Sequence, residues 1–156
     1  MRIASSAGLL LLVALFVLTA CERTADTSNV ETTAGSGIKR VNDPDLIATG
    51  QQVYRANCAQ CHGEGAEGAT NWRQPGAGGR YPAPPLNGTG HAWHHSTAVL
   101  THMIKNGSEA GRGDMPAWGG KLSDDEIRAV IAWFQSLWPD PVYAAWYEMQ
   151  QRSPGQ

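Results

Sequence analysis

The residues best suited to chemistry in this sequence are Cys58, Cys61 and His62, which occur in the order Cys-Ala-Gln-Cys-His. On a helix, positions three apart share a face, so the two sulfurs can reach the two vinyl groups along one edge of a porphyrin. The imidazole of the next residue then lies under the iron and can bind it. The spacing therefore predicts one covalently attached haem c, with His62 as an axial ligand.

Two other kinds of site use closely spaced cysteines. A redox dithiol of the thioredoxin type needs a βαβ context, and a zinc site needs a second pair of ligands. The only other cysteine is Cys21, far from the pair. Haem attachment is therefore the interpretation that the motif favours.

Residues 1–20 predict a lipoprotein signal peptide. Arg2 is positive, and an apolar run from Leu9 to Leu18, short for a bilayer span, is followed by small residues. The sequence Leu-Thr-Ala-Cys at its end resembles a bacterial lipobox, which implies cleavage before Cys21 and lipidation of that residue. Ordinary signal cleavage, leaving Cys21 as a free thiol, is the alternative. We expect a lipid-anchored protein on the periplasmic face of a bacterial membrane.

The remaining chain predicts one domain with a tether before it. Residues 21–42 are rich in Thr, Ser, Ala and Gly without an apolar period, which is typical of a flexible tether. We expect a haem domain over 43–138 and an extension with a short helix over 139–156. The formal net charge of −2 gives no indication of a nucleic-acid partner.

The elements that must position the haem motif begin with a helix starting at Asp43, whose carboxylate can cap it. Gly50 and Tyr54 lie on one helical stripe with Cys58. Followed by Cys-X-X-Cys-His-Gly, this arrangement resembles the N-terminal helix of class I c-type cytochromes. In that family the glycine lets the first and last helices cross closely, and the neighbouring aromatic packs in the crossing.

The resemblance covers about residues 43–138 and implies the fold of that family. This fold is all-α, with three to four short helices and long loops around one covalent haem. The same resemblance assigns Pro84 as the carbonyl that accepts a hydrogen bond from the proximal imidazole, and Leu86 as a contact of the porphyrin ring. Pro82 or Pro85 could provide the carbonyl instead, because this loop is long and rich in proline.

The second axial ligand has two candidates, Met103 and Met115. Met103 falls on the apolar face of a predicted helix, where core packing is the ordinary role. Met115 stands on a glycine-rich loop before a proline, and Met-Pro-Ala-aromatic resembles the axial methionine segment of class I cytochromes. We therefore expect Met115 to bind the iron and Trp118 to form a wall of the haem crevice.

A group of histidines and a tryptophan precedes the next helix, which Ser96 can cap. Trp93 is expected to pack on the haem or to donate its N–H to a propionate. A second metal site at His91, His94 and His95 is an open alternative, although no carboxylate or cysteine completes it.

Two further helices are predicted after the methionine loop. Ser123 and Glu126 form a capping box for a helix that ends before Pro139. A shorter helix then follows within 139–156, and its apolar face could pack back on the domain or contact a partner.

Together these features predict electron transfer and no enzymatic activity, because His62 and Met115 would fill both axial positions of the iron. The expected partners are a redox donor and acceptor, including a membrane respiratory complex. One alternative is a haem subunit of a larger dehydrogenase or oxidase. Another is a peroxidase or gas-sensing haem protein with a labile distal ligand.

Overall fold

We analysed a computed structural model of the chain, which describes residue 38 and residues 40–152. The expected signal peptide, Cys21 and most of the expected tether lie outside these residues. The helices, in order, are α1 (Pro44–Asn57), α2 (Ala59–His62), the 3-10 helix η1 (Ala92–His94), α3 (Thr97–Asn106), α4 (Asp124–Ser136) and α5 (Asp140–Arg152). Within the described part the β-type pairing is limited to one bridge, between Tyr81 and Gly113. The all-α prediction is confirmed.

Side-chain caps begin three of these helices at the residues that the sequence indicates. The Asp43 carboxylate accepts hydrogen bonds from two backbone N–H groups in the first turn of α1. The Ser96 hydroxyl accepts one from the first turn of α3. Ser123 and Glu126 form a reciprocal capping box at the start of α4. Each cap satisfies backbone donors that the helix itself leaves unpaired.

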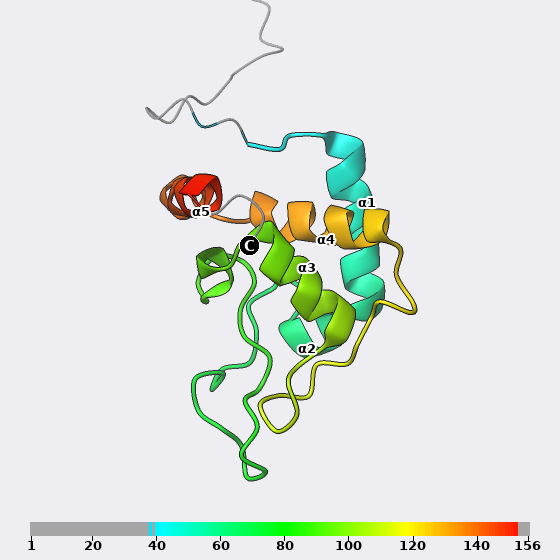
Figure 1. Cartoon of the computed structure of the whole chain (residues 1–156), viewed down its shortest axis with the longest axis vertical. Coiled ribbons are helices and arrows are strands. Elements are labelled where there is room, and N and C mark those ends of the chain that lie inside the picture. The colour runs from blue at the N-terminus through cyan, green and yellow to red at the C-terminus, as the bar shows by residue number, and fades with distance from the viewer. Residues whose placement is uncertain (1–37, 39, 153–156) are drawn as a thin grey trace, which may run out of the picture. The chain divides into compact units, whose positions relative to one another are not determined.

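Helices α1 and α4 cross at Gly50 (Figure 1). A Cβ atom on Gly50 would collide with the backbone carbonyl of Ala129 and would lie 2.8 Å from the Cβ of Trp133. One turn further along α1, the ring of Tyr54 packs 4.1 Å from that of Trp133. The absence of a side chain at Gly50 therefore permits the close crossing.

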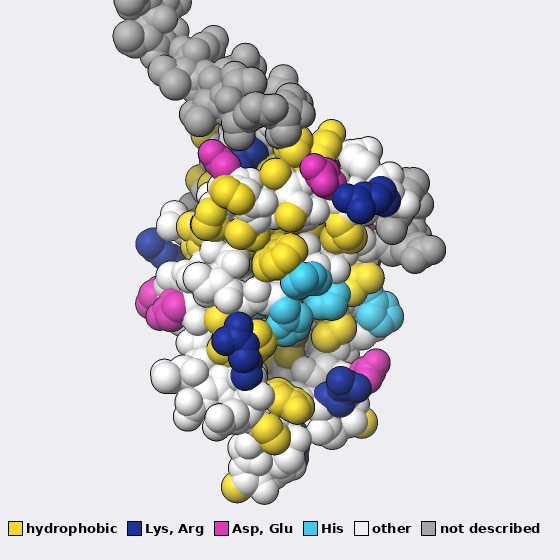
Figure 2. Space-filling view, turned by 90° about the vertical axis from the view of Figure 1, so that its left-hand side faces the viewer, with side chains coloured by type: hydrophobic (Ala, Val, Ile, Leu, Met, Phe, Trp, Pro, Cys, Tyr) yellow, Lys and Arg dark blue, Asp and Glu magenta, His cyan; other side chains and the backbone are white. Residues whose placement is uncertain are grey.

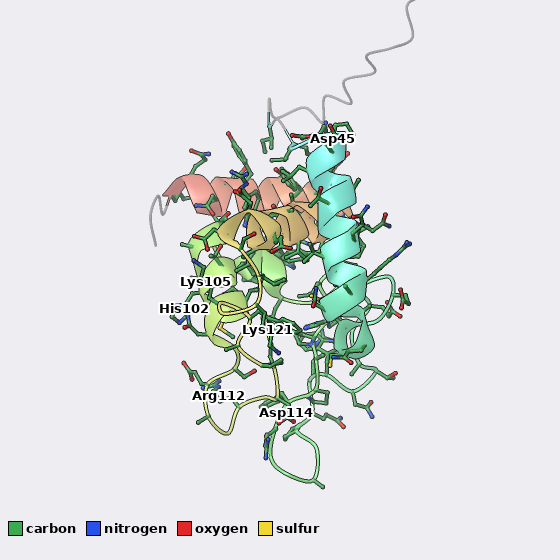
Figure 3. The ribbon with its side chains drawn as sticks, turned by 90° about the vertical axis from the view of Figure 1, so that its right-hand side faces the viewer. Asp45, His102, Lys105, Arg112, Asp114 and Lys121 are labelled. Carbon is green, nitrogen blue, oxygen red and sulfur yellow. The ribbon has the colours of Figure 1, made fainter. Side chains whose placement is uncertain are left out.

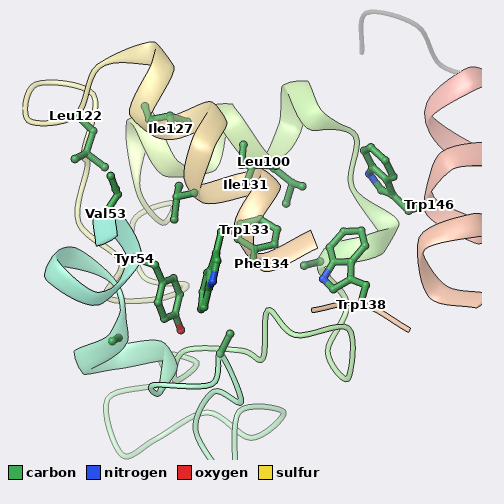
Figure 4. Close-up of a cluster of buried hydrophobic side chains, with 14 of the residues drawn as sticks. Val53, Tyr54, Leu100, Leu122, Ile127, Ile131, Trp133, Phe134, Trp138 and Trp146 are labelled. Carbon is green, nitrogen blue, oxygen red and sulfur yellow. The ribbon is translucent and has the colours of Figure 1, made fainter. Parts of the chain in front are cut away.

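The core gathers around this crossing (Figure 4). Its largest fully buried side chains are those of Tyr54, Ile127, Val130 and Trp138. Large aromatic side chains contribute most of the apolar area that a small domain can remove from water. Two of these four residues, Ile127 and Val130, lie on α4, and eight of the thirteen residues of that helix are buried, so α4 is the central helix of the domain.

Helix α5 packs back on the domain. Tyr143 and Trp146 are buried, and the indole N–H of Trp146 donates a 3.1 Å hydrogen bond to the carbonyl of His95. Arg40 lies over the ring of Tyr143 and forms a 3.3 Å ion pair with Asp140. The apolar face of this helix is therefore covered by its own domain.

The described residues form two short helices that the sequence analysis did not predict. Cys58, with φ −115° and ψ −36°, separates α1 from the single turn of α2, and the other is the 3-10 helix η1. No helix among the described residues is both long enough and apolar enough to span a membrane.

Candidate haem-binding site

A cavity of about 1100 Å³ lies between α2, α3 and the two long loops of the domain. Its volume is slightly above the range of about 300–1,000 Å³ that is usual for ligand and cofactor pockets. Cys58, Cys61, His62 and Met115 all line this one cavity. The donor atoms that the sequence predicts for a haem are thus brought together by the fold.

His62 is held in one orientation by the loop that follows it. Its Nδ1 lies 2.8 Å from the carbonyl oxygen of Pro84, so among the three candidate prolines Pro84 occupies the accepting position. Because a carbonyl only accepts, Nδ1 carries the proton and Nε2 keeps its lone pair for a metal. Burial lowers the pKa of His62, an effect partly opposed by the bond to Pro84. Both the bond and the lowered pKa suit a neutral, metal-binding imidazole.

The residues flanking the motif are tied to the core. The Tyr54 hydroxyl donates a 2.6 Å hydrogen bond to the carbonyl of Gly63. Leu86 lines the cavity, and its carbonyl accepts a 2.7 Å hydrogen bond from the indole N–H of Trp138. The wall beside His62 is therefore anchored to both α1 and the end of α4.

Met115 lies on a loop closed by its own backbone. Its carbonyl accepts a 3.0 Å hydrogen bond from the N–H of Ser108, and its N–H donates a 3.3 Å bond to the Ser108 hydroxyl. Gly107 has φ +75°, and its Cα lies so close to this loop that a Cβ would crowd Pro116. Figure 3 shows Asp114, next to Met115, on this loop. These contacts place Met115 at the cavity.

Met103 also lines the cavity, from α3, with 37% of its surface exposed. The cavity therefore has two thioethers on its wall. The two residues differ in their position in the chain, because Met103 belongs to the regular helix α3 whereas Met115 lies on the loop before Pro116.

Of the two tryptophans expected to contact the haem, Trp118 and Trp93, only the first lies at the cavity. Trp118 lines the cavity. Trp93 does not, because its ring stacks on His94 at 3.6 Å and its indole N–H donates a 3.0 Å hydrogen bond to the carbonyl of Gly90. We therefore leave Trp93 out of the residues assigned to the cofactor.

Sequence reasoning missed Trp72, Arg73, His91 and His95 as lining residues of this cavity. The histidines stood out only as a possible second metal site, yet the described part of the chain has no group of three or more His, Cys, Asp or Glu side chains arranged to hold a metal ion. Arg80, which lies in the same loop as Arg73, instead pairs with Asp114.

Comparison with known proteins supports haem c as the cofactor. The family model described as cytochrome c oxidase, cbb3-type, subunit III matches residues 45–134. The chain is 35% identical over 95 residues to the cbb3-type cytochrome c oxidase subunit CcoP of Azospirillum sp. (strain B510), covering 61% of this chain and 30% of that protein. It is 37% identical over 87 residues to cytochrome c6 of Tetradesmus obliquus, covering 56% of this chain and 85% of that protein.

The fold is also shared with a solved structure. Cytochrome CL from the marine methylotrophic bacterium Methylophaga aminisulfidivorans superposes with a TM-score of 0.51 at 24% identity, covering 72% of this chain and 70% of that one. At 24% identity this similarity supports a shared fold and nothing about function.

The helical fold, the Cys-X-X-Cys-His motif and the cavity define a haem electron-transfer protein of the c type. The chain belongs to the class I c-type cytochrome family, in the branch whose model describes the cbb3-type oxidase subunit III, and its cofactor is haem c. It spans less than a third of the length of the CcoP relative named above. When bound here, the haem supplies an iron that gains and loses one electron.

Proposed function

We propose that this protein carries single electrons, with Cys58 and Cys61 holding the porphyrin and with His62 and Met115 as the axial ligands. The observation that supports this most is the bond from His62 Nδ1 to Pro84, which leaves Nε2 for iron inside a cavity that Met115 also lines. Two protein ligands leave no axial position for a substrate, as a carrier requires.

The surrounding residues suit this role. A thioether sulfur is a soft ligand that favours ferrous iron, so Met115 raises the reduction potential. Leu86 and Trp118 supply apolar walls that keep water away from the haem. Exclusion of water also favours the ferrous haem, because it carries one positive charge fewer than the ferric haem. The proposed carrier therefore has a positive potential.

Carbon monoxide binding tests this carrier function against the sensing or peroxidase alternative. Ferrous wild-type protein should bind carbon monoxide slowly and weakly at neutral pH, because Met115 must leave first. Ferric protein should show negligible turnover of hydrogen peroxide. Rapid carbon monoxide binding by intact wild-type protein would contradict the carrier assignment.

We further propose that residues 21–42 tether the haem domain to the periplasmic face of a bacterial membrane through a lipid on Cys21. The support is the lipobox-like sequence before Cys21 and the polar composition after it. The variant Cys21→Ser should lose its acyl chains while its haem spectrum stays unchanged. Intact mass of mature wild-type protein without acyl chains would contradict this proposal.

A second candidate function is that of a haem subunit in a larger oxidase. It is favoured by the description of the matching family model and by the CcoP relatives. Purification after mild crosslinking would distinguish the two, because a subunit co-purifies with a stoichiometric partner whereas a free carrier does not. In either case the partners are a redox donor and acceptor, such as a membrane respiratory complex.

A further inference from the structure

Four residues that the haem ligation does not use form a group on the cavity wall: Trp72, Arg73, His91 and His95. The imidazole rings of His91 and His95 are 5.5 Å apart. His91 stacks on Trp72 at 5.3 Å, and the Arg73 guanidinium lies 4.4 Å from the Trp72 ring. We call this group the histidine–arginine rim. Figure 2 shows histidine side chains gathered on one face, with Lys or Arg side chains below them.

The rim holds a positive charge that no carboxylate of the described chain neutralises. The other charged side chains lining the cavity are paired, Arg112 with Glu109 at 4.0 Å and Asp114 with Arg80. Arg73 forms no ion pair within the described residues, although it is held against Trp72. A guanidinium without a counter-ion beside two imidazoles is a set of donors suited to a carboxylate.

The two imidazoles lie in an environment that lacks an anion. Burial, followed by the charges of His94 and Arg73, lowers the pKa of His91. Burial, followed by the charges of His91 and His94, lowers the pKa of His95. On the side of α5 the neighbour is the uncharged Trp146, whose N–H bonds to the His95 carbonyl. Every charged neighbour named here is a cation, so an anion at the rim would relieve repulsion among them.

We propose that the histidine–arginine rim binds the propionate carboxylates of the haem, and that His91 and His95 bind protons more tightly when the iron is reduced. A porphyrin joined to Cys58 and Cys61 through its vinyl edge presents its two propionates at the other edge, and the rim offers unpaired cationic donors for them. This inference rests on the haem c of the family and not on the identity of the distal ligand.

The sign of the coupling follows from charge. Each electron that the partner protein delivers lowers the net charge of the cavity by one, which stabilises a protonated imidazole nearby. The proton comes from the solvent. The pKa of the rim histidines is consequently higher in the ferrous than in the ferric protein, and the reduction potential falls as pH rises between the two pKa values. One proton per electron sets the limit at about 59 mV per pH unit.

The test is a redox titration of the full-length holoprotein from pH 5 to pH 9. We expect the wild-type potential to fall with pH in the range where imidazoles titrate. His91→Gln and His95→Gln should each reduce the slope, and the double variant should abolish it. His102→Gln is the matched control: His102 lies on α3 (Figure 3) and is not among the residues that line the cavity, so this variant should leave the slope unchanged.

Proton NMR of the wild-type imidazoles in both oxidation states gives a second readout that needs no variant to fold. At least one of His91 and His95 should show a higher pKa in the ferrous protein. A potential that is constant over this pH range, a slope that survives in the double variant, or rim pKa values equal in both states would each overturn the inference. None of these results depends on whether Met115 binds the iron, so the failure of either proposal can be distinguished from that of the other.

Discussion

The phenolic oxygen of Tyr54 lies 2.6 Å from the carbonyl oxygen of Gly63, the residue that follows the haem-binding histidine, and its hydroxyl donates a hydrogen bond there. Tyr54 is fully buried, and its ring packs 4.1 Å from that of Trp133 in α4. One side chain therefore connects α1, α4 and the end of the haem motif.

Replacing this hydroxyl should weaken the domain. Tyr54→Phe keeps the ring packing and removes the donor, which leaves a partly buried carbonyl without this partner. We expect the free energy of unfolding to fall by about 1–3 kcal/mol in urea titrations of the holoprotein. Tyr147→Phe, in the less buried part of α5, should change it by less than about 0.5 kcal/mol. Equal effects of the two variants would contradict the connecting role of Tyr54.

The same residue predicts how stability depends on alkaline pH. Burial raises the pKa of Tyr54 well above its ordinary value, and the nearby carboxylates of Glu67 and Glu64 add to the shift. Above about pH 10 the unfolded chain therefore loses this proton while the folded protein keeps it. The free energy of unfolding should then fall by up to about 1.4 kcal/mol per pH unit from this residue. Tyr54→Phe should make the alkaline decline shallower, and an unchanged slope would disprove the assignment.

The helix crossing can be tested at Gly50. A methyl group there would collide with the Ala129 carbonyl, so Gly50→Ala must push α1 away from α4. We expect a loss of about 1–3 kcal/mol or more in unfolding free energy. Gly120→Ala is the control, because a Cβ at Gly120 meets nothing within 4 Å and should change stability by less than about 0.5 kcal/mol. A Gly50→Ala protein as stable as wild type would show that the crossing tolerates a side chain.

The parts of this structure that sequence reasoning predicted are those governed by local chemistry. The caps at Asp43, Ser96 and Ser123 depend on side chains reaching backbone groups two or three residues away. The close crossing at Gly50 could be predicted only because the whole pattern resembled a known family. The expectation that Cys58, Cys61 and His62 act on one haem rests on the spacing of neighbouring residues in the chain, which is also local.

What the sequence could not predict depends on contacts between distant segments. The sequence analysis expected Trp93 to contact the haem. In the structure Trp93 lies on η1, its indole N–H donates a hydrogen bond to the carbonyl of Gly90, and it does not line the cavity. The same short helix places His91 at the cavity, where it meets Trp72 from a loop almost twenty residues earlier. The packing of Trp146 against the carbonyl of His95 likewise joins segments that share no local pattern.

The haem attachment should be required for a stable fold. The cavity is about 1100 Å³ and lies between helices of only a few turns, which are marginal on their own. The double variant Cys58→Ser, Cys61→Ser should therefore yield little folded protein, as measured by far-ultraviolet circular dichroism and thermal unfolding. Single variants should retain part of the fold through the remaining thioether. A cooperative, near-wild-type melt of the double variant without haem would contradict this prediction.

The most direct test of the proposed ligation is the weak near-infrared sulfur-to-iron charge-transfer band of the ferric protein. Met103 and Met115 both line the cavity, so the same substitution at each gives a matched comparison. We predict that the band is present in wild type, persists in Met103→Ala and disappears in Met115→Ala, together with faster carbon monoxide binding and a lower reduction potential. Loss of the band in Met103→Ala with its retention in Met115→Ala, or a wild-type protein without the band, would contradict the account.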